Sequence, residues 1–237
     1  MKIKIGLIIL LLLFTAYFAI AVGEISTSIS WKPITLPEKN ESKKLLLNPD
    51  EHIYNFVGIT SPSSTNTAWK GINDNANPAS PISRGETELT TDEYGYISYS
   101  DDIWANKQGG DATDFPAFRW KFVVTEDPKT VTQIDVSVEG KGGTNGEEND
   151  GWTFYIRNWL GGFEQLSETY DNAEITLTGQ ITSSIASYID DGGNIELEIV
   201  TKGASSGGTG IYLDYAFATI TYTVPPTANA QLIMISE

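Results

Sequence analysis

The strongest constraint on the fold is an alternation of apolar and polar residues that recurs along the chain. Every second residue in each run is apolar, which places the apolar side chains on one face of an extended strand. At least seven such runs occupy residues 94–99, 118–124, 134–139, 154–157, 175–178, 195–199 and 219–224. Glycine-rich turns separate them. The sequence therefore predicts an all-β chain, an antiparallel two-sheet β-sandwich.

Two further segments depart from this alternation. Residues 182–189 are the only stretch with a helical pattern, and that stretch is short. Residues 61–83 are rich in Ser, Thr, Asn and Pro and predict a loop that is long for a compact domain. Long loops of this kind tend to be functional or mobile.

The N-terminal segment has the composition of a secretory leader. Lys2 and Lys4 precede an uncharged apolar block over residues 6–21, which ends in Ala-Ile-Ala. A basic start, a short apolar core and a small-x-small end predict a signal peptide cleaved after Ala21. Two alternatives stay open: cleavage after Gly6, at a site resembling archaeal pilin processing, or retention of the whole segment as an apolar anchor. The membrane is a partner only in those cases.

Composition narrows the location and the chemistry. The chain has no cysteine, which fits a secreted protein on the surface of a prokaryote and excludes cysteine nucleophiles and thiolate zinc sites. The only histidine is His52, so multi-histidine metal sites are excluded. A formal net charge of −16 repels nucleic acid, which we exclude as a partner. We expect no catalysis, with glycoside hydrolysis by paired carboxylates as the residual alternative.

Changes in composition predict four parts of the chain. They are a signal peptide or anchor (1–21), a strand-like segment and linker (22–52), a globular domain (53–224) and an apolar C-terminal tail (225–237). Within the linker, Asn40-Glu41-Ser42 matches the acceptor pattern for N-glycosylation at Asn40.

Four segments of the predicted domain carry a resemblance to known proteins. Together they resemble the β jelly-roll modules of archaeal and bacterial secreted surface proteins, of the galactose-binding-like and carbohydrate-binding-module kinds. The segments are Gly85–Thr90 with Glu93-Tyr94, Phe154–Leu166, Ile181–Asp190 and Ile211–Tyr222. The resemblance covers roughly residues 53–224 and implies a jelly-roll sandwich that binds glycans. The fold is the stronger implication, because one fold hosts many functions.

Asp214 is the acidic residue with the most unusual position. Counting by twos along its strand, it shares a face with Ala216, Ala218 and Ile220. That parity directs a carboxylate toward the core. A buried carboxylate must be paired with an opposite charge, hydrogen-bonded or bound to a metal ion. The alternatives are a β-bulge that turns Asp214 to solvent and a hydrogen bond to the backbone.

The resemblance supplies a partner for this carboxylate. Jelly-roll modules of that kind often hold a structural calcium ion between an early acidic residue and an aspartate of the last strand. By resemblance, Asp214 would be that aspartate, with Glu88 or Glu86 as the early residue. Asp101 belongs to an acidic doublet that would add a further oxygen ligand, although such doublets usually serve turn geometry.

Tryptophans outside the alternating runs are the candidates for glycan binding. Trp69, Trp104 and Trp159 lie in or beside predicted turns, where their rings would be presented for stacking on sugars. Packing within the sandwich is the alternative for each ring. Trp120 and Trp152 lie in alternating runs and are predicted to be core residues.

Two classes of function follow. The first is a non-catalytic extracellular surface module for adhesion or for binding a glycan or cell-surface polymer. The alternative is a self-assembling subunit of a filament, pilus or surface layer. In that case the strand-like segments 24–31 and 231–235 would exchange between copies and form a homopolymer.

Overall fold

The computed structural model of the protein describes residues 49–60, 65–76, 82–111, 113–144, 151–203 and 209–224. All of them belong to one of the two units into which the chain divides, residues 47–237. The predicted leader, the Asn40 acceptor and the two strand-like terminal segments lie outside the described residues. Within the described ranges, no helix has both the length and the apolar character to cross a membrane.

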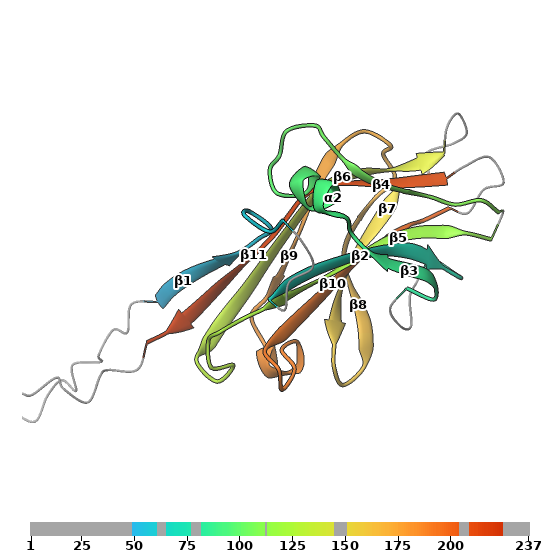
Figure 1. Ribbon diagram of the computed structural model, residues 1–237. Coiled ribbons are helices and arrows are strands. Elements are labelled where there is room, and N and C mark those ends of the chain that lie inside the picture. Colours follow the sequence, from blue (N-terminus) through green and yellow to red (C-terminus); the bar gives the residue numbers. More distant parts are fainter. Residues whose placement is uncertain are drawn as a thin grey trace, which may run out of the picture. The chain divides into compact units, whose positions relative to one another are not determined.

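Two antiparallel sheets make up the fold, which confirms the predicted all-β sandwich (Figure 1). The five-stranded sheet contains β1 (Pro49–Tyr54), β11 (Thr209–Thr223), β6 (Val131–Thr144) and β9 (Ile175–Ile181) in that order, with β4 (Ala105–Gln108) also pairing with β11. The six-stranded sheet has the order β3 (Arg84–Glu88), β2 (Asn66–Asn73), β5 (Phe115–Val123), β10 (Asn194–Thr201), β7 (Trp152–Asn158) and β8 (Gly162–Thr169).

The core fills the space between the sheets with the apolar halves of the alternating runs. Phe118, Trp120 and Phe122 of β5 are fully buried, and so are the inward residues of β10 and β11. Trp120 stacks on Phe154 with ring centroids 5.8 Å apart. Trp152 is also fully buried, so the prediction that Trp120 and Trp152 are core residues is confirmed. Each such side chain contributes about 1.5–3 kcal/mol by burial.

One predicted strand, residues 94–99, is wrong. The chain forms the short helix α2 (Thr91–Tyr96) there, because Thr90 and Glu93 make a capping box at its N-terminus. Tyr94 and Ile97, three residues apart, are both fully buried on one side of this helical turn. The sequence Thr-x-x-Glu is a helix-start signal that was present, and it outweighs the short alternation that follows.

The loop predicted over residues 61–83 is wrong in its middle, where β2 pairs with β3 and β5. Gly71 and the asparagines at both ends of β2 weaken its strand pattern. In the predicted helical stretch, only the 3₁₀ turn η1 (Ile185–Ser187) is helical.

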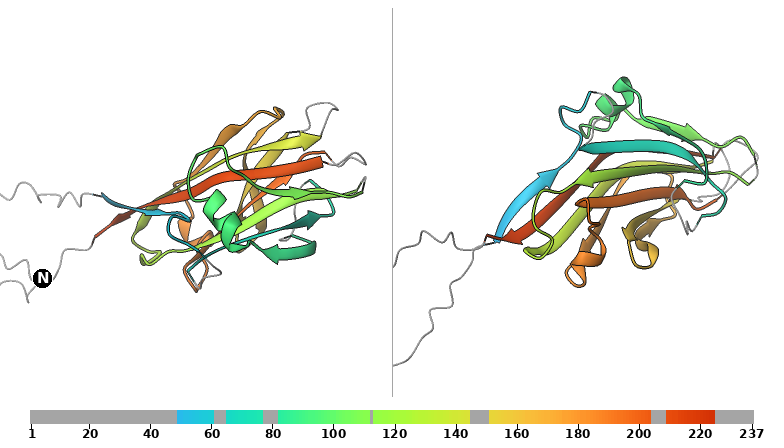
Figure 2. Two further views of the ribbon diagram at one scale, coloured as in Figure 1. Left: turned by 45° about the horizontal axis from the view of Figure 1, so that its top comes forward. Right: turned by 60° about the horizontal axis from the view of Figure 1, so that its bottom comes forward.

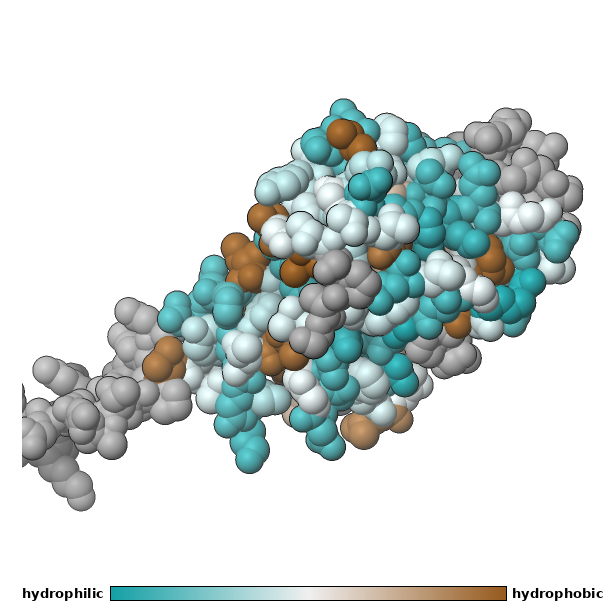
Figure 3. Space-filling view, viewed as in Figure 1, coloured by the Kyte–Doolittle hydropathy of each residue, from teal (hydrophilic) through white to brown (hydrophobic). Residues whose placement is uncertain are grey.

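The first strand begins earlier than the domain predicted from residue 53. β1 starts at Pro49, so His52 is a strand residue, and its Nδ1 lies 2.8 Å from Glu126 Oε1. Pro49 pairs with Thr223, and β1 and the end of β11 project together beyond the rest of the sandwich (Figure 2). The described chain therefore begins and ends at one tip. On the face shown in Figure 3, apolar residues form separate small spots in a mainly hydrophilic surface.

Candidate functional site

The outer face of the six-stranded sheet carries a row of aromatic, arginine and glutamate side chains. Trp69, Arg119, Glu196 and Arg157 each adjoin a core residue on their strands and therefore point away from the core. Two arginines hold one glutamate between them: Arg119 Nη1 donates to Glu196 Oε1 (2.8 Å) and Arg157 Nη1 donates to Glu196 Oε2 (2.9 Å). We call this set the aromatic–arginine row; it consists of Trp69, Arg119, Glu196, Arg157, Trp159 and Phe163.

Each arginine of the row also stacks on an aromatic ring. The Arg119 guanidinium lies 4.2 Å from the centroid of Trp69, and that of Arg157 lies 4.1 Å from Trp159. Glu86 of β3 also pairs with Arg119, reaching across the intervening strand β2. The glutamate of the row is 4 % exposed and Arg119 is 14 % exposed. Ion pairs with two arginines hold Glu196, and ion pairs with two glutamates together with stacking on Trp69 hold Arg119. The three rings remain partly exposed.

Beside the row, Ile82, just before β3, packs on the same sheet face. Ile82 is buried against Ala117, Tyr155 and Val200. A side chain at position 71 would clash with Ile82, which explains the glycine in β2 at that point. Ile82 therefore borders the aromatic–arginine row on one side.

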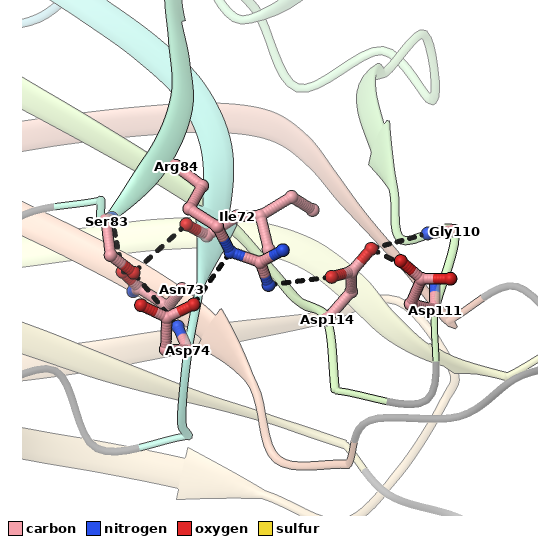
Figure 4. Close-up of polar contacts among 8 residues, drawn as sticks. All are labelled: Ile72, Asn73, Asp74, Ser83, Arg84, Gly110, Asp111 and Asp114. Atoms are coloured by element: carbon pink, nitrogen blue, oxygen red, sulfur yellow. Dashed lines mark hydrogen bonds and ion pairs between the residues drawn. The ribbon is translucent and has the colours of Figure 1, made fainter.

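A polar network holds the residues that follow Ile82 in place (Figure 4). Arg84 lies between two carboxylates, with Nε 2.7 Å from Asp74 Oδ1 and Nη2 2.7 Å from Asp114 Oδ1. The backbone N–H of Gly110 donates to Asp114, and this hydrogen bond, with the Arg84 guanidinium, holds the pKa of Asp114 below its usual value. Ser83 N–H donates to the Asn73 side chain of β2 (3.1 Å). The network joins the β2–β3 connection to the β4–β5 connection.

Next to this network lies a fully buried acid, Glu198. Asn73 Nδ2 donates to its Oε1, and its Oε2 has no hydrogen-bond partner among the described residues. Burial raises the pKa of Glu198 to about 8, with further contributions from Glu196 and Glu86, while Asn73 and Arg119 oppose the rise. The side chain is therefore mainly protonated at neutral pH.

A second candidate site lies on the five-stranded sheet, where a β-bulge interrupts β11. Leu213 pairs with Gly140 and Tyr215 pairs with Glu139, so Asp214 is the extra residue. A β-bulge that would turn Asp214 to solvent was one of the alternatives from the sequence. The bulge is present, but the Asp214 side chain is fully buried. Its carboxylate lies with those of Asp102 and Glu174, one oxygen of each lying within 4.8 Å of the others. We call these three residues the carboxylate cluster.

Strand register explains why the cluster forms. Leu213 pairs with Ala105, the first residue of β4, and with Gly140 of β6, which in turn pairs with Ile175, the first residue of β9. The turns that enter β4 and β9 therefore come close to the bulge, and they carry Asp102 and Glu174. Asp102 has a left-handed backbone (φ 63°), which is uncommon for a residue with a side chain.

The chemistry of the cluster fits a hard cation. Among the described residues, neither oxygen of Asp214 has a hydrogen-bond partner. Burial raises the pKa of Asp214 to about 6, and the charges of Glu139, Glu174 and Asp101 add to the rise. The nearby backbone amide of Asp102 lowers the pKa of Asp214 somewhat, although it is not placed to form a hydrogen bond with the carboxylate. Buried carboxylates without a counter-charge are unfavourable, and Ca²⁺ prefers oxygen ligands of this kind.

The partners of Asp214 differ from those that the resemblance implied. Glu88 accepts a hydrogen bond from the Tyr94 hydroxyl (2.9 Å), and Glu86 pairs with Arg119, so both lie in other contacts. Asp101 stands next to the cluster but accepts from the Ile103 backbone (3.2 Å). Asp102 belongs to the same acidic doublet as Asp101, the residue that the sequence suggested as a candidate ligand. No sequence pattern around Glu174 indicated a metal ligand.

The three tryptophans predicted to bind ligand lie in two places. Trp69 and Trp159 both belong to the aromatic–arginine row. Trp104 lies beside the carboxylate cluster, where its Nε1–H donates to Glu174 Oε1 (2.8 Å). Lys141 Nζ lies 3.4 Å from the centroid of the Trp104 ring. Trp104 thus contacts a member of the cluster directly.

Comparison with known proteins gives a family and distant structural likenesses. A family model described as "AF_1625_C: Uncharacterized protein, C-terminal domain" matches residues 63–222. No curated protein matches the chain. The chain is similar to the xylan-binding module CBM15, with 12 % identity over 74 % of this chain and 100 % of that one, at a TM-score of 0.38.

Two other solved structures show likenesses of the same order. TmCBM61 in complex with β-1,4-galactotriose has 11 % identity over 73 % of this chain and 88 % of that one (TM-score 0.29). A cyclase from Fischerella sp. TAU, in complex with 4-(1H-indol-3-yl)butan-2-one, has 12 % identity over 74 % and 86 % (TM-score 0.36). These neighbours include binding modules and an enzyme, so they do not decide the function, which is argued below from the residues of this chain.

Proposed function

The chain belongs to the AF_1625_C family, and we propose that this member is a non-catalytic module that binds carbohydrate. The observation that carries the proposal is the aromatic–arginine row. Partly exposed rings offer flat apolar surfaces on which the C–H faces of sugars stack. The arginine groups between the rings offer donors for hydroxyl groups. Because pairing already fixes these side chains, binding would cost little conformational entropy.

The two carboxyl groups of β10 on this face support a binding role rather than hydrolysis. Glu196 and Glu198 are the two carboxyl groups that point outward from β10. Both oxygens of Glu196 accept from arginines, and Glu198 is fully buried. Glycoside hydrolysis needs one carboxylic acid and one carboxylate that both reach the scissile bond. Neither residue meets that requirement.

A glycan array with matched variants tests the proposal. Wild type should bind a defined set of glycans, and Trp69→Ala and Trp159→Ala should each weaken binding at least tenfold, about 1.4 kcal/mol. Leu160→Ala is the control, because that side chain is 88 % exposed and lies next to the row in sequence. Melting curves confirm that the variants fold. Binding that is equal in wild type and both tryptophan variants would contradict the proposal.

We further propose that the module works at the outer surface of a prokaryotic cell, in adhesion or in holding a cell-surface polymer. This part rests on the leader-like sequence of residues 1–21 and on the absence of cysteine. The intact mass of the protein from its native cells tests it. A chain that starts at Val22 supports release as a secreted module, whereas a chain that keeps residues 1–21 points to an anchored form.

We also propose that the module holds a structural Ca²⁺ ion, with Asp102, Glu174 and Asp214 as protein ligands. Bound there, the ion would supply the positive charge that the buried Asp214 carboxylate lacks. The ligands come from the turn before β4, the turn before β9 and the bulge of β11. Binding would therefore stabilise the junction of three segments that are distant in sequence.

A further inference from the structure

The outer face of the five-stranded sheet contains a cleft of about 550 Å³, away from the aromatic–arginine row. This volume lies within the range of about 300–1,000 Å³ that is usual for small-molecule sites. Strands β6, β9 and β11 form most of its wall, and β8 contributes one residue. The lining residues are Asp135, Val136, Ser137, Leu166, Thr178, Gly179, Gln180 and Phe217.

An aromatic ring forms one wall of the cleft. Phe217 points outward, because Ala216 and Ala218 on either side of it are fully buried in the core. Its ring contacts that of Tyr215, with centroids 5.4 Å apart and planes inclined by 36°. The bulge at Asp214 sets this parity, since it places the residues after it in the register that turns both rings outward.

Polar groups stand opposite the ring in direct strand register. Phe217 pairs with Ser137, and Ser137 pairs with Thr178, so one aromatic and two hydroxyl side chains form a line across three strands. Asp135 accepts at Oδ1 from Gln180 Nε2 (2.8 Å) and at Oδ2 from Gln133 Nε2. The amides fix the carboxylate and keep their own oxygens available as acceptors.

The apolar end of the cleft depends on a glycine. A Cβ at position 179 would lie 2.7 Å from Leu166 Cδ1, so only glycine lets the leucine of β8 approach β9 this closely. Leu166 thereby brings the edge of the six-stranded sheet to the edge strand of the other sheet. The cleft combines an aromatic wall, an aliphatic end and a line of hydroxyl, amide and carboxylate groups.

We propose that this cleft is a second binding site, for a neutral saccharide. Among the described residues, no lysine or arginine lines it, so an anionic sugar would meet Asp135 without a counter-charge. Hydroxyl and amide groups opposite an aromatic ring match the alternating C–H and O–H surfaces of a neutral sugar ring. The proposal goes beyond the function proposed above, because the site lies on the other sheet and shares no residue with the aromatic–arginine row.

Nuclear magnetic resonance titration separates the two sites. The ¹⁵N-labelled protein is titrated with neutral di- to tetrasaccharides of glucose, galactose, mannose and xylose. We expect saturable shifts of the amides of residues 178–180 and 217. Phe217→Ala and Gln180→Ala should each weaken that binding at least fivefold. Trp159→Ala and the control Ile53→Ala, an exposed residue on the same sheet, should leave it unchanged. Gln180 is exposed, so its variant keeps the test valid if Phe217→Ala does not fold.

The remaining outcomes overturn the inference in distinguishable ways. Shifts confined to the aromatic–arginine row would exclude the second site and leave the proposed function standing. Shifts at the cleft that persist unchanged in both cleft variants would mean that the lining residues named here do not bind the sugar. No shift at either place with any probe would contradict both proposals.

Discussion

Two acidic side chains, Asp214 and Glu198, are buried to the same extent in opposite sheets, yet their surroundings differ. Both are fully buried, and both keep at least one oxygen without a hydrogen-bond partner among the described residues. Asp214 lies among further carboxylates in the cluster with Asp102 and Glu174. Glu198 accepts a hydrogen bond from the Asn73 amide, and the positive charge of Arg119 lowers its pKa.

The difference shows two ways in which a protein compensates a buried acid. The pKa of Glu198 rises to about 8, so a proton neutralises this group at neutral pH and it packs as an uncharged acid. The pKa of Asp214 rises only to about 6, so the group is mainly ionised at neutral pH and needs a positive charge. Burial alone therefore does not mark a metal site; the neighbouring oxygens do.

The largest expected effect is the response of the carboxylate cluster to calcium. At a Ca²⁺ concentration one hundred times Kd, binding stabilises the folded protein by about 2.7 kcal/mol. For a domain of this size we expect the Tm to rise by roughly 5–10 °C relative to chelator. Differential scanning calorimetry at pH 7 with Ca²⁺ and with EDTA measures the difference. Asp214→Asn should abolish it, and in EDTA this variant should be at least as stable as wild type.

The comparison supplies its own control for that experiment. Glu198→Gln changes the other buried acid and should keep the full response to calcium. A wild-type Tm that is equal in Ca²⁺ and EDTA would contradict the calcium proposal. An equal response in Asp214→Asn and wild type would place the ion elsewhere.

The next largest effect is the pH dependence that Glu198 imposes. Because its folded pKa is raised, the folded state holds a proton that the unfolded state loses, so stability falls as pH rises from about 4.5 to about 8. Glu198→Gln should remove this fall and should be more stable than wild type at pH 8.5, by on the order of 1–3 kcal/mol. Urea unfolding at pH 5 and pH 8.5 measures it. A variant that is less stable than wild type at pH 8.5 would show that the carboxylate is compensated by charge.

A smaller effect is expected at Asn73, which donates the hydrogen bond to Glu198. Asn73→Ala leaves a buried carboxyl oxygen without that donor and should cost about 1–3 kcal/mol. The response to calcium should stay as in wild type, because the two acids lie in different sheets. Calorimetry with and without Ca²⁺ checks both statements, and a reduced calcium response would mean that the two regions are coupled.

The smallest effect is expected at Glu88, the partner of Asp214 that the resemblance implied. Glu88 accepts from the Tyr94 hydroxyl instead, and Glu88→Gln keeps an acceptor at that position. We expect a change in stability within about 1 kcal/mol and an unchanged calcium response. A calcium response lost in this variant would restore Glu88 as a ligand and contradict the carboxylate cluster.

Much of the fold was predictable because packing follows the alternation of side chains. The runs at 118–124, 134–139 and 195–199 each give strands whose inward-facing apolar residues are buried. The run at 94–99 failed because a capping box formed by Thr90 and Glu93 stabilises a helical turn there. Strand β2 was missed because Gly71 interrupts its strand pattern. The glycine is needed for the close packing of Ile82, and that contact cannot be read from the alternation of residues along β2.

The candidate sites were less predictable because they depend on register. Parity along one strand directs Asp214 inward, but only the pairing of β4, β6, β9 and β11 brings Asp102 and Glu174 to it. Trp69 and Trp159 were recognised as candidates by their positions near turns. Their place in one row with Arg119, Glu196 and Arg157 follows from the order of strands in the six-stranded sheet, which the sequence alone does not specify.

A crystal structure of the protein with the tightest-binding glycan from the array tests the central claim most directly. The proposed function predicts a sugar ring stacked on Trp69 or Trp159, with hydroxyl groups hydrogen-bonded to Arg157 or Arg119. Density for the glycan that leaves the aromatic–arginine row uncontacted would contradict that function, whatever other surface it occupied.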